Sequence, residues 1–335
     1  MMKQSHANLV SVRKSSNNAQ RLSGFDQLAA LCLVIGLCAC DVAPGAETEP
    51  PALAALAQAP CELWIRYYVI DELELPVDVE QAEQLGMDLD GDGDVDNNAG
   101  LVIAQIASEY EGARAQLSSS VEASLTGHKV NWILGLSRCT DNQTHARVHL
   151  YEGADTNRDG VLELAIAIDS RVPAVGTLSN QGELDVRDGE GIVPVSALFD
   201  VLGVADTVEW SPARGLALSA QLAQVESLAG ILAAGLEPEM AVQAAALPLA
   251  GFFSTLVGTG RSPLADQLDH DGDGRVSGNE VRTNIVVRLF AMPALALMAK
   301  HNGQLVYWPG HGTPDYLGLG LGFHATPVTL GNSDI

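Results

Sequence analysis

Oxygen-bearing side chains of this sequence gather in short glycine-containing clusters in which every second residue is acidic or polar. The clearest cluster runs from position 269 to position 280. A Ca²⁺ ion takes about six to eight oxygen ligands, and a twelve-residue loop supplies them from positions 1, 3, 5, 7, 9 and 12, with glycine at position 6. Gly274 stands at position 6 here, so the spacing predicts a Ca²⁺ site. Its candidate ligands are Asp269, Asp271, Asp273, Arg275 through its carbonyl, Ser277 and Glu280.

Helical patterns flank this third loop, residues 269–280. Ser262 followed by Pro263 is typical of a helix start, and a second helix is expected to run from the loop to Pro293. Segment 262–291 therefore resembles an EF-hand, with Val276 expected to anchor the loop to the core. A solvated acidic turn, the alternative, needs neither Glu280 nor two helices. The expected apolar face of the leaving helix comprises Val281, Ile285, Val286, Leu289 and Phe290.

Two earlier clusters repeat the start of the pattern but lack the acid at position 12, which is Ala99 in one and Ile166 in the other. Both resemble a nine-residue calcium loop in which a carboxylate at position 9 can ligate directly. The first has predicted helices on both sides, as in a degenerate EF-hand. The second lies between predicted strands, as in the calcium hairpins of integrin-type propeller blades. In the first loop, residues 88–96, the candidate ligands are Asp88, Asp90, Asp92, Asp94 and Asp96; in the second loop, residues 155–163, they are Asp155, Asn157, Asp159, Val161 and Glu163.

Repulsion within the first loop favours a bound cation, because five carboxylates fall within nine residues and like charges at this spacing cost free energy. Ca²⁺ suits such loops better than Mg²⁺, which prefers octahedral sites that keep several waters. Extracellular modules bind Ca²⁺ at about 10⁻⁴–10⁻³ M, so constant occupancy outside the cell is favoured over sensing. Pairing of the first and third loops through Val95 and Val276 is left open.

Charge and composition exclude one class of function. The 335 residues include 18 Lys and Arg against 42 Asp and Glu, a formal net charge of -24. Sequence-independent nucleic-acid binding rests on Lys and Arg that neutralise phosphates, so no nucleic-acid partner is expected. Hydrophobic residues make up 47% and charged residues 18%, a balance that predicts a folded core rather than an acidic disordered chain.

The N-terminus carries an export pattern. Twelve apolar residues, 28–39, follow a polar start with four basic residues, too few for a membrane span of about 20 residues. They end in Leu37-Cys-Ala-Cys40, which resembles the lipobox of bacterial lipoproteins and implies lipidation of Cys40 after removal of a signal peptide, residues 1–39. An ordinary signal peptide is the alternative. Residues 40–60 then form a Pro-rich acidic tether. The chain is thus expected in the cell envelope, held to the inner or the outer membrane by its lipid.

Two further cysteines, Cys61 and Cys139, are left once the signal is removed and Cys40 is acylated. In an oxidising compartment such a pair is expected to form a disulfide, and two separate buried thiols are the alternative. The uncharged stretch 240–260 is long enough to span a membrane, but Gln243 and Pro248 interrupt it. We interpret it as a buried helix that begins at Pro238.

The order of predicted elements indicates an α+β fold. Strands are expected near 62–70, 130–138, 146–152, 162–169, within 173–210 and at 317–328, with helices at 78–87, 101–117 and over most of 216–257. This predicts a β-rich core with peripheral helices, one EF-hand helix-loop-helix and two further Asp-rich calcium loops. The expected divisions are an α+β core at 61–260, the helix-loop-helix at 261–300 and a C-terminal strand and tail at 301–335.

The loops, the anchor and the Gly-rich last strand together resemble uncharacterised EF-hand lipoproteins of myxobacteria and their relatives. The matching segments are Leu-Asp-Gly-Asp-Gly-Asp-Val-Asp-Asn at 89–97 and Asp-Gly-Asp-Gly-Arg-Val-Ser at 271–277. The resemblance covers most of residues 62–330, and only the calcium loops in it are specific. It implies no activity.

Motifs for catalysis are absent from the sequence after the predicted signal peptide: residues 40–335 contain no G-x-S-x-G, H-E-x-x-H, S-x-x-K or P-loop. His145 and His149 fall in a predicted strand, about 13 Å apart and too far to share a metal. The first hypothesis is therefore a calcium-stabilised structural or adhesive surface module, whose protein or polysaccharide partner the sequence does not identify. The alternative is a calcium-stabilised secreted hydrolase with unidentified catalytic residues. A calcium switch in which segment 262–291 opens an apolar groove is a third possibility.

Overall fold

In the computed structural model the described residues are 63–109, 113–126, 130–139, 145–155, 159–164, 172–200, 208–223, 227–302 and 304–331. All of them belong to one compact unit, Val42–Ile335. The predicted signal peptide, Cys40, the tether, Cys61 and Asn157 lie outside the described residues. Lipidation of Cys40 and the disulfide between Cys61 and Cys139 therefore stay predictions.

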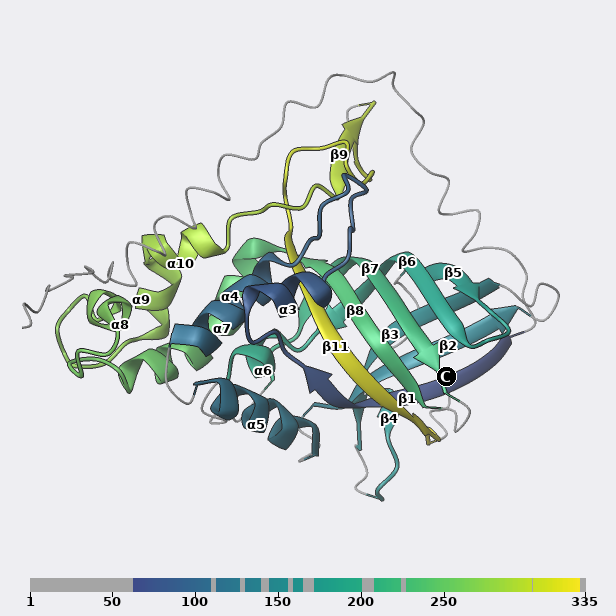
Figure 1. Cartoon of the computed structure of the whole chain (residues 1–335), viewed down its shortest axis with the longest axis horizontal. Helices are drawn as coiled ribbons and strands as arrows, with labels where there is room; N and C mark the ends of the chain where they lie inside the picture. The colour runs from purple at the N-terminus through teal and green to yellow at the C-terminus, as the bar shows by residue number, and fades with distance from the viewer. Residues whose placement is uncertain are drawn as a thin grey trace, which may run out of the picture. The chain divides into compact units, whose positions relative to one another are not determined.

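Eight antiparallel strands form a closed barrel (Figure 1). Each barrel strand pairs with the next barrel strand along the chain. The last of them, β11, pairs with the first, β1, which closes the barrel. A short strand, β4 (Glu163–Leu164), pairs only with the end of β3. The predicted β-rich core of an α+β protein is thus confirmed. The barrel strands are β1 (Leu63–Glu74), β2 (Trp132–Cys139), β3 (His145–Ala154), β5 (Ala174–Leu178), β6 (Glu183–Val193), β7 (Ser211–Leu222), β8 (Leu228–Leu236) and β11 (Leu317–Val328).

The main hydrophobic core fills the barrel. Strand residues alternate between the two faces of a sheet, and one set from each strand joins a continuous cluster of buried side chains. An eight-stranded barrel has an interior just wide enough for side chains to fill it. Trp132 and Tyr68, both fully buried, are the largest members of the cluster.

Helices lie in three of the strand connections, and in Figure 1 they gather to the left of the strands. Between β1 and β2 the chain forms α3 (Val79–Gln84), α4 (Asn98–Glu109) and α5 (Ala113–Thr126). The short α6 (Val195–Phe199) joins β6 to β7. Between β8 and β11 lie α7 (Pro238–Ser254), α8 (Pro263–Leu268), α9 (Gly278–Thr283), α10 (Ile285–Phe290) and the hairpin of β9 (Met298–His301) and β10 (Gln304–Tyr307).

The apolar stretch 240–260 is a mostly buried helix up to Ser254, as predicted, and residues 255–260 form turns. It belongs to α7, which begins with Pro238 at its first position and buries ten side chains, among them Phe252 and Phe253. Among the helices of the described residues, none is long and apolar enough to cross a membrane.

The prediction that residues 216–257 are mostly helical is wrong for the first half of the segment. Residues 211–222 and 228–236 are strands β7 and β8, and only α7 is helical. Alanine has the highest helix propensity, which favoured a helix here. Tertiary pairing overrides it, because β7 bonds to β6 on one edge and to β8 on the other.

Two predicted helices are each divided. The segment 101–117 contains parts of two helices, α4 and α5, rather than one. The helix after the third loop ends at Thr283, because Asn284 adopts an extended conformation and its side chain caps α10 by accepting N–H bonds from Val286 and Val287. The predicted continuous apolar face is therefore wrong, and Ile285 is 69% exposed.

The Gly-rich last strand has a packing reason. Its leucines 317, 319 and 321 point into the core, and the glycines between them face the other side of the sheet. A Cβ at Gly318 would lie 2.7 Å from the carbonyl oxygen of Asp96, and one at Gly320 would lie 2.2 Å from that of Leu85. Glycine is thus required for the backbone of 85–96 to lie directly on β11.

One buried side chain joins this segment to the barrel. Asn97 is 3% exposed. Its Nδ2 donates to the carbonyls of Ala82, at 2.8 Å, and Gly320, at 3.1 Å. Its Oδ1 accepts hydrogen bonds from the N–H groups of Gly100, at 3.0 Å, and Gly320, at 2.7 Å. One amide therefore ties α3, the start of α4 and the last barrel strand together.

Replacing Asn97 by Ala should lower the free energy of unfolding by about 2–4 kcal/mol, because it leaves several buried backbone groups of α3, α4 and β11 without partners. Denaturant unfolding of the two proteins measures the difference. The exposed Asn279 provides the matched control, and Asn279→Ala should change the value by less than about 0.5 kcal/mol. Equal losses for both variants would contradict the role given to Asn97.

Candidate metal centres

The three Asp-rich loops share one local geometry. In each loop the N–H of the glycine at position 6 donates a hydrogen bond to the carboxylate at position 1. The distance from nitrogen to oxygen is 3.2 Å in the first loop and 3.0 Å in the other two. The carboxylate at position 5 accepts the N–H bond of position 7 at 2.8 Å in all three. The glycines at position 6 have φ values of +94°, +85° and +85°, which other residues rarely adopt. In all three loops the N–H groups of positions 6 and 7 therefore donate to the carboxylates of positions 1 and 5.

In the third loop the structure brings three predicted ligands together. Asp269, Asp271 and Asp273 each offer a carboxylate oxygen within 4.8 Å of the others. Helices α8 and α9 flank the loop as predicted. Oδ1 of Asp269 is buried and accepts no hydrogen bond from the described residues. A buried carboxylate oxygen without a donor is costly, and a cation between the three side chains would remove that cost.

Glu280 lies outside this trio and fills two roles that the sequence interpretation missed. Its carboxylate accepts the N–H of His270, at 2.7 Å, and both the N–H and the hydroxyl of Ser277, at 2.7 and 2.8 Å. The Ser277 hydroxyl accepts the Glu280 N–H in return, which forms a capping box at the start of α9. The bonds from Ser277 are the main cause that lowers the pKa of Glu280. The signal for the capping box was the Ser-x-x-Glu spacing itself. Arg275 takes part through its N–H, which bonds to Asp273.

Val276 anchors the third loop in the core, as predicted. Its N–H donates to the hydroxyl of Ser254 on α7, at 2.8 Å, and its carbonyl accepts from the same hydroxyl, at 3.1 Å. Val95, which lies in the first loop, is half-exposed. The main chain of Val276 is thus bonded to α7, and the pairing with Val95 that the sequence left open is not formed.

The first loop also brings three carboxylates together, and more deeply. Asp88, Asp90 and Asp96 offer oxygens within 4.8 Å of one another, and the side chains of Asp90 and Asp96 are only 9% and 7% exposed. Asp96, at position 9, thus joins the trio as the nine-residue pattern predicts. Asp92 and Asp94 are exposed and lie outside it.

The trio of the first loop is electrostatically strained. Burial is the largest cause that raises the pKa of Asp96 to about 7, and repulsion by Asp90 acts in the same direction, whereas a hydrogen bond from the Leu89 N–H opposes it. Burial likewise raises the pKa of Asp90. No ion pair between described residues includes a member of the trio. The guanidinium of Arg187 bonds to the carbonyl of Asp88, at 3.2 Å, and not to its carboxylate.

The second loop connects β3 to β4, so its predicted place between two strands is confirmed. Asp155 and Asp159 adopt the shared geometry, and Val161 contributes the N–H that bonds to Asp159. Glu163 begins β4. Asn157 lies outside the described residues, and the described members of this loop form no close trio of carboxylates.

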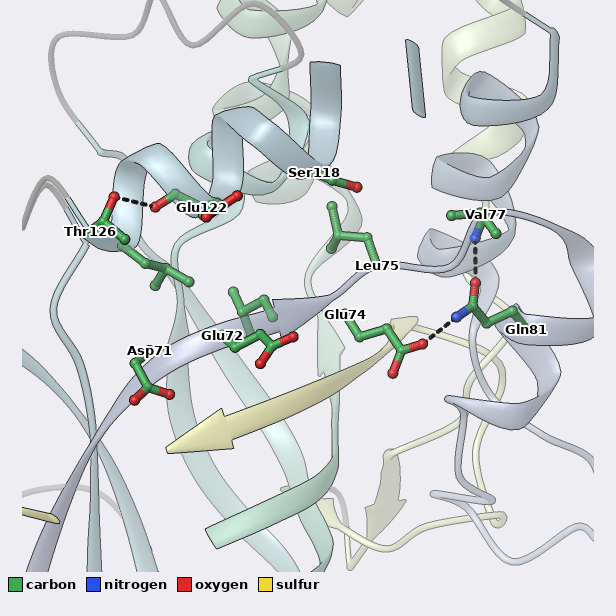
Figure 2. A pocket seen from close by; sticks show the side chains of 11 residues that line it. Asp71, Glu72, Glu74, Leu75, Val77, Gln81, Ser118, Glu122 and Thr126 are labelled. Carbon is green, nitrogen blue, oxygen red and sulfur yellow. Dashed lines mark hydrogen bonds between the residues drawn. The ribbon is translucent and has the colours of Figure 1, made fainter. Parts of the chain in front are cut away.

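A separate hollow of about 610 Å³ lies between the end of β1 and helices α3 and α5 (Figure 2). Glu74 accepts a hydrogen bond from the Gln81 amide, and Asp71, also on β1, lies 2.7 Å from Nδ1 of His324. No histidine or cysteine is among its lining residues, so they include no serine–histidine or cysteine–histidine pair for nucleophilic catalysis. The lining residues are Asp71, Glu72, Leu73, Glu74, Leu75, Val77, Gln81, Ser118, Glu122, Leu125 and Thr126.

Among the described residues, no histidine belongs to a group of three possible metal-ligating side chains. His145 and His149 lie in β3, as predicted. The ring of His149 stacks on Tyr151, and burial lowers its pKa to about 4. His311 stacks on Trp308, with ring centroids 4.6 Å apart, and His301 meets the same indole edge-on.

No family model matches this sequence, and no curated protein or solved structure matches it either.

The pKa of Asp96 predicts a pH effect in the presence of a chelator. A carboxyl whose folded-state pKa lies near 7, against about 3.9 when unfolded, binds its proton more tightly in the folded protein. Stability should therefore fall as the pH rises from about 4 to about 7, and no further above that. Asp96→Asn should reduce this slope, as measured by denaturant unfolding between pH 4.5 and 8. Asp273→Asn is the control, and an unchanged slope in Asp96→Asn would contradict the prediction.

Proposed function

We propose that this protein binds Ca²⁺ in its Asp-rich loops and that the ion mainly stabilises a structural or adhesive module of the cell surface. The observation that carries the proposal is the pair of carboxylate trios, each with its oxygens within 4.8 Å. Three like charges so close together repel one another unless a cation or protons offset them. The described Lys, Arg and His side chains form no ion pair with either trio.

The donor set favours Ca²⁺ over other metals. All candidate ligands are hard oxygens from carboxylates, a hydroxyl and main-chain carbonyls, which suit Ca²⁺ and Mg²⁺ rather than zinc or copper. Ca²⁺ tolerates the irregular, carboxylate-rich cage of a short loop, whereas Mg²⁺ demands near-octahedral geometry. In the third loop the EF-hand pattern adds the Arg275 carbonyl, Ser277 and Glu280 as ligands, and the unpartnered oxygen of Asp269 supports a cation there.

The attachment of these loops to the barrel and to the main core fits a stabilising role better than an enzymatic one. The first loop lies on β11, where Asn97 fixes its end, and the third loop has Val276 in the main core. An ion in either loop would therefore join elements that are far apart in the sequence. The carboxylate-lined hollow includes no serine–histidine or cysteine–histidine pair among its lining residues.

The place of action rests on the N-terminal pattern alone. Leu37-Cys-Ala-Cys40 and the apolar run before it support export, lipidation of Cys40 and attachment to a membrane in the cell envelope. Residues 40–60 would then hold the barrel away from the membrane surface. Outside the cell, Ca²⁺ is abundant enough for constant occupancy of such loops.

Calorimetric titration of the full chain with Ca²⁺ tests the binding. We expect two or three equivalents, and a melting temperature that rises by several degrees with Ca²⁺ but much less with Mg²⁺. Glu280→Gln should remove the equivalent of the third loop, and Asp96→Asn that of the first. Glu239→Gln, an exposed acid of α7, is the control and should leave all equivalents in place. Absence of heat at millimolar Ca²⁺ would show that the loops are solvated acidic turns.

Metabolic labelling with palmitate in a bacterium that processes lipoproteins tests the anchor. The wild-type chain should carry the label and partition with membranes, whereas Cys40→Ser should lose the label, because no thiol is left at the acylation position. Cys38→Ser is the matched control and should be labelled. A labelled Cys40→Ser variant would contradict the assignment of the lipobox.

A further inference from the structure

Residues 294–316 form an arm that leaves the barrel after α10 and returns at β11. A main-chain bridge between Leu295 and Tyr316 closes its base, and β9 and β10 form its hairpin. In Figure 1 the arm stands at the top of the picture, with the dark blue segment of the first loop beside it.

The arm covers a second, smaller hydrophobic cluster on the outside of the barrel. Leu295 and Leu297 pack there against Ala217 of β7 and Ala233 of β8. Met87 and Leu89, at the start of the first loop, complete the same cluster. The arm and the first loop thus share one apolar contact on the barrel wall, which is far smaller than the main core.

Asp90 connects the first loop to the arm directly. Its Oδ2 accepts the N–H bond of Ala296, at 3.1 Å. Gly310, whose N–H bonds to the Ala296 carbonyl, lies so close to the Asp90 carbonyl that a Cβ there would be 2.5 Å from the oxygen. One member of the carboxylate trio therefore also holds the base of the arm.

Two other polar contacts between the arm and the barrel are distant from the trio in sequence. The guanidinium of Arg214 on β7 bonds to the sulfur of Met298, at 3.6 Å. The hydroxyl of Tyr307 donates to Asp188, at 2.8 Å. Asp188 lies in the bulge of β6 and has a φ of +63°. This bond gives the arm a second attachment that involves no residue of the first loop.

We propose that Ca²⁺ in the first loop controls the docking of the arm on the barrel. This rests on the proposed calcium function. Without a cation, repulsion among Asp88, Asp90 and Asp96 disfavours the loop conformation that presents Asp90 to Ala296. An ion shared by the three carboxylates holds that conformation, so the hydrogen bond, the close contact at Gly310 and the apolar cluster form together. The arm then closes over the barrel wall when calcium is bound and opens when it is removed.

A lysine-specific protease measures this opening on the full chain. Lys300 is exposed at the end of β9, and the nearest other lysine in the sequence is Lys129, so cleavage of the arm gives its own fragments. Cleavage after Lys300 in chelator should be at least about 10-fold faster than in millimolar Ca²⁺. The side chain is exposed in both states, but its main chain is held in β9 while the arm is docked and becomes available to the protease when the arm opens. Calorimetry on the same sample establishes whether calcium binds.

Matched variants separate arm docking from general stabilisation. Asp90 and Asp271 both stand at position 3 of their loops, so Asp90→Asn should abolish the protection by Ca²⁺ whereas Asp271→Asn should keep it. Gly310→Ala displaces the arm without changing a ligand, so it should reduce protection while the same number of Ca²⁺ equivalents still binds. The affinity of the first loop should fall, because the coupling between binding and docking is reciprocal.

Equal rates with and without Ca²⁺ in a protein that binds the ion would overturn the docking proposal and leave the calcium function intact. Equal loss of protection in Asp90→Asn and Asp271→Asn would also overturn it. Absence of any calcium heat would end both proposals.

Discussion

The four hydrogen bonds of Asn97 are the constraint on which the rest of the structure depends. A buried amide that satisfies α3, α4 and both main-chain groups of Gly320 tolerates no sliding of these elements relative to one another. It fixes the end of the first loop against the strand that closes the barrel. The burial of Asp96 fits this attachment, because the end of the loop lies directly on β11, whereas Asp92 and Asp94 face solvent.

The two carboxylate trios differ in how deeply their charges are buried and in how their loops are attached to the rest of the protein. The first loop buries two of its carboxylates, Asp90 and Asp96, so the cost of leaving them without a counter-charge is high. The third loop exposes most of its carboxylates and is fixed through one apolar residue, Val276, and through the capping box of Ser277 and Glu280. A cation would therefore contribute most to the fold at the first loop. At the third loop it would chiefly order the approach of α8 to α9.

Local patterns in the sequence predicted local structure well. The alternating leucines and glycines of 317–328 predicted a strand with the observed bounds. The Asp spacing predicted three loops, and the structure adds that they share a hydrogen-bond geometry. Longer-range features were missed for physical reasons. The Ala-rich residues 211–222 and 228–236 form strands because their backbone partners lie in β6, β7, β8 and β11, which no local pattern reveals. The burial of Asp96 could not be predicted either, since it depends on Gly318, more than 200 positions away.

Closure of the barrel by its first and last strands has a consequence for biogenesis. Strand β11 pairs with β1 on one edge and with β8 on the other, so until it emerges the sheet has two open edges and the main core is exposed along a seam. Contacts between chain ends are slow to form, because their loop-closure entropy must be overcome first. A chain of this topology has to be kept from pairing with its neighbours until β11 has joined the sheet. Truncation near the C-terminus would accordingly affect the whole barrel rather than one strand.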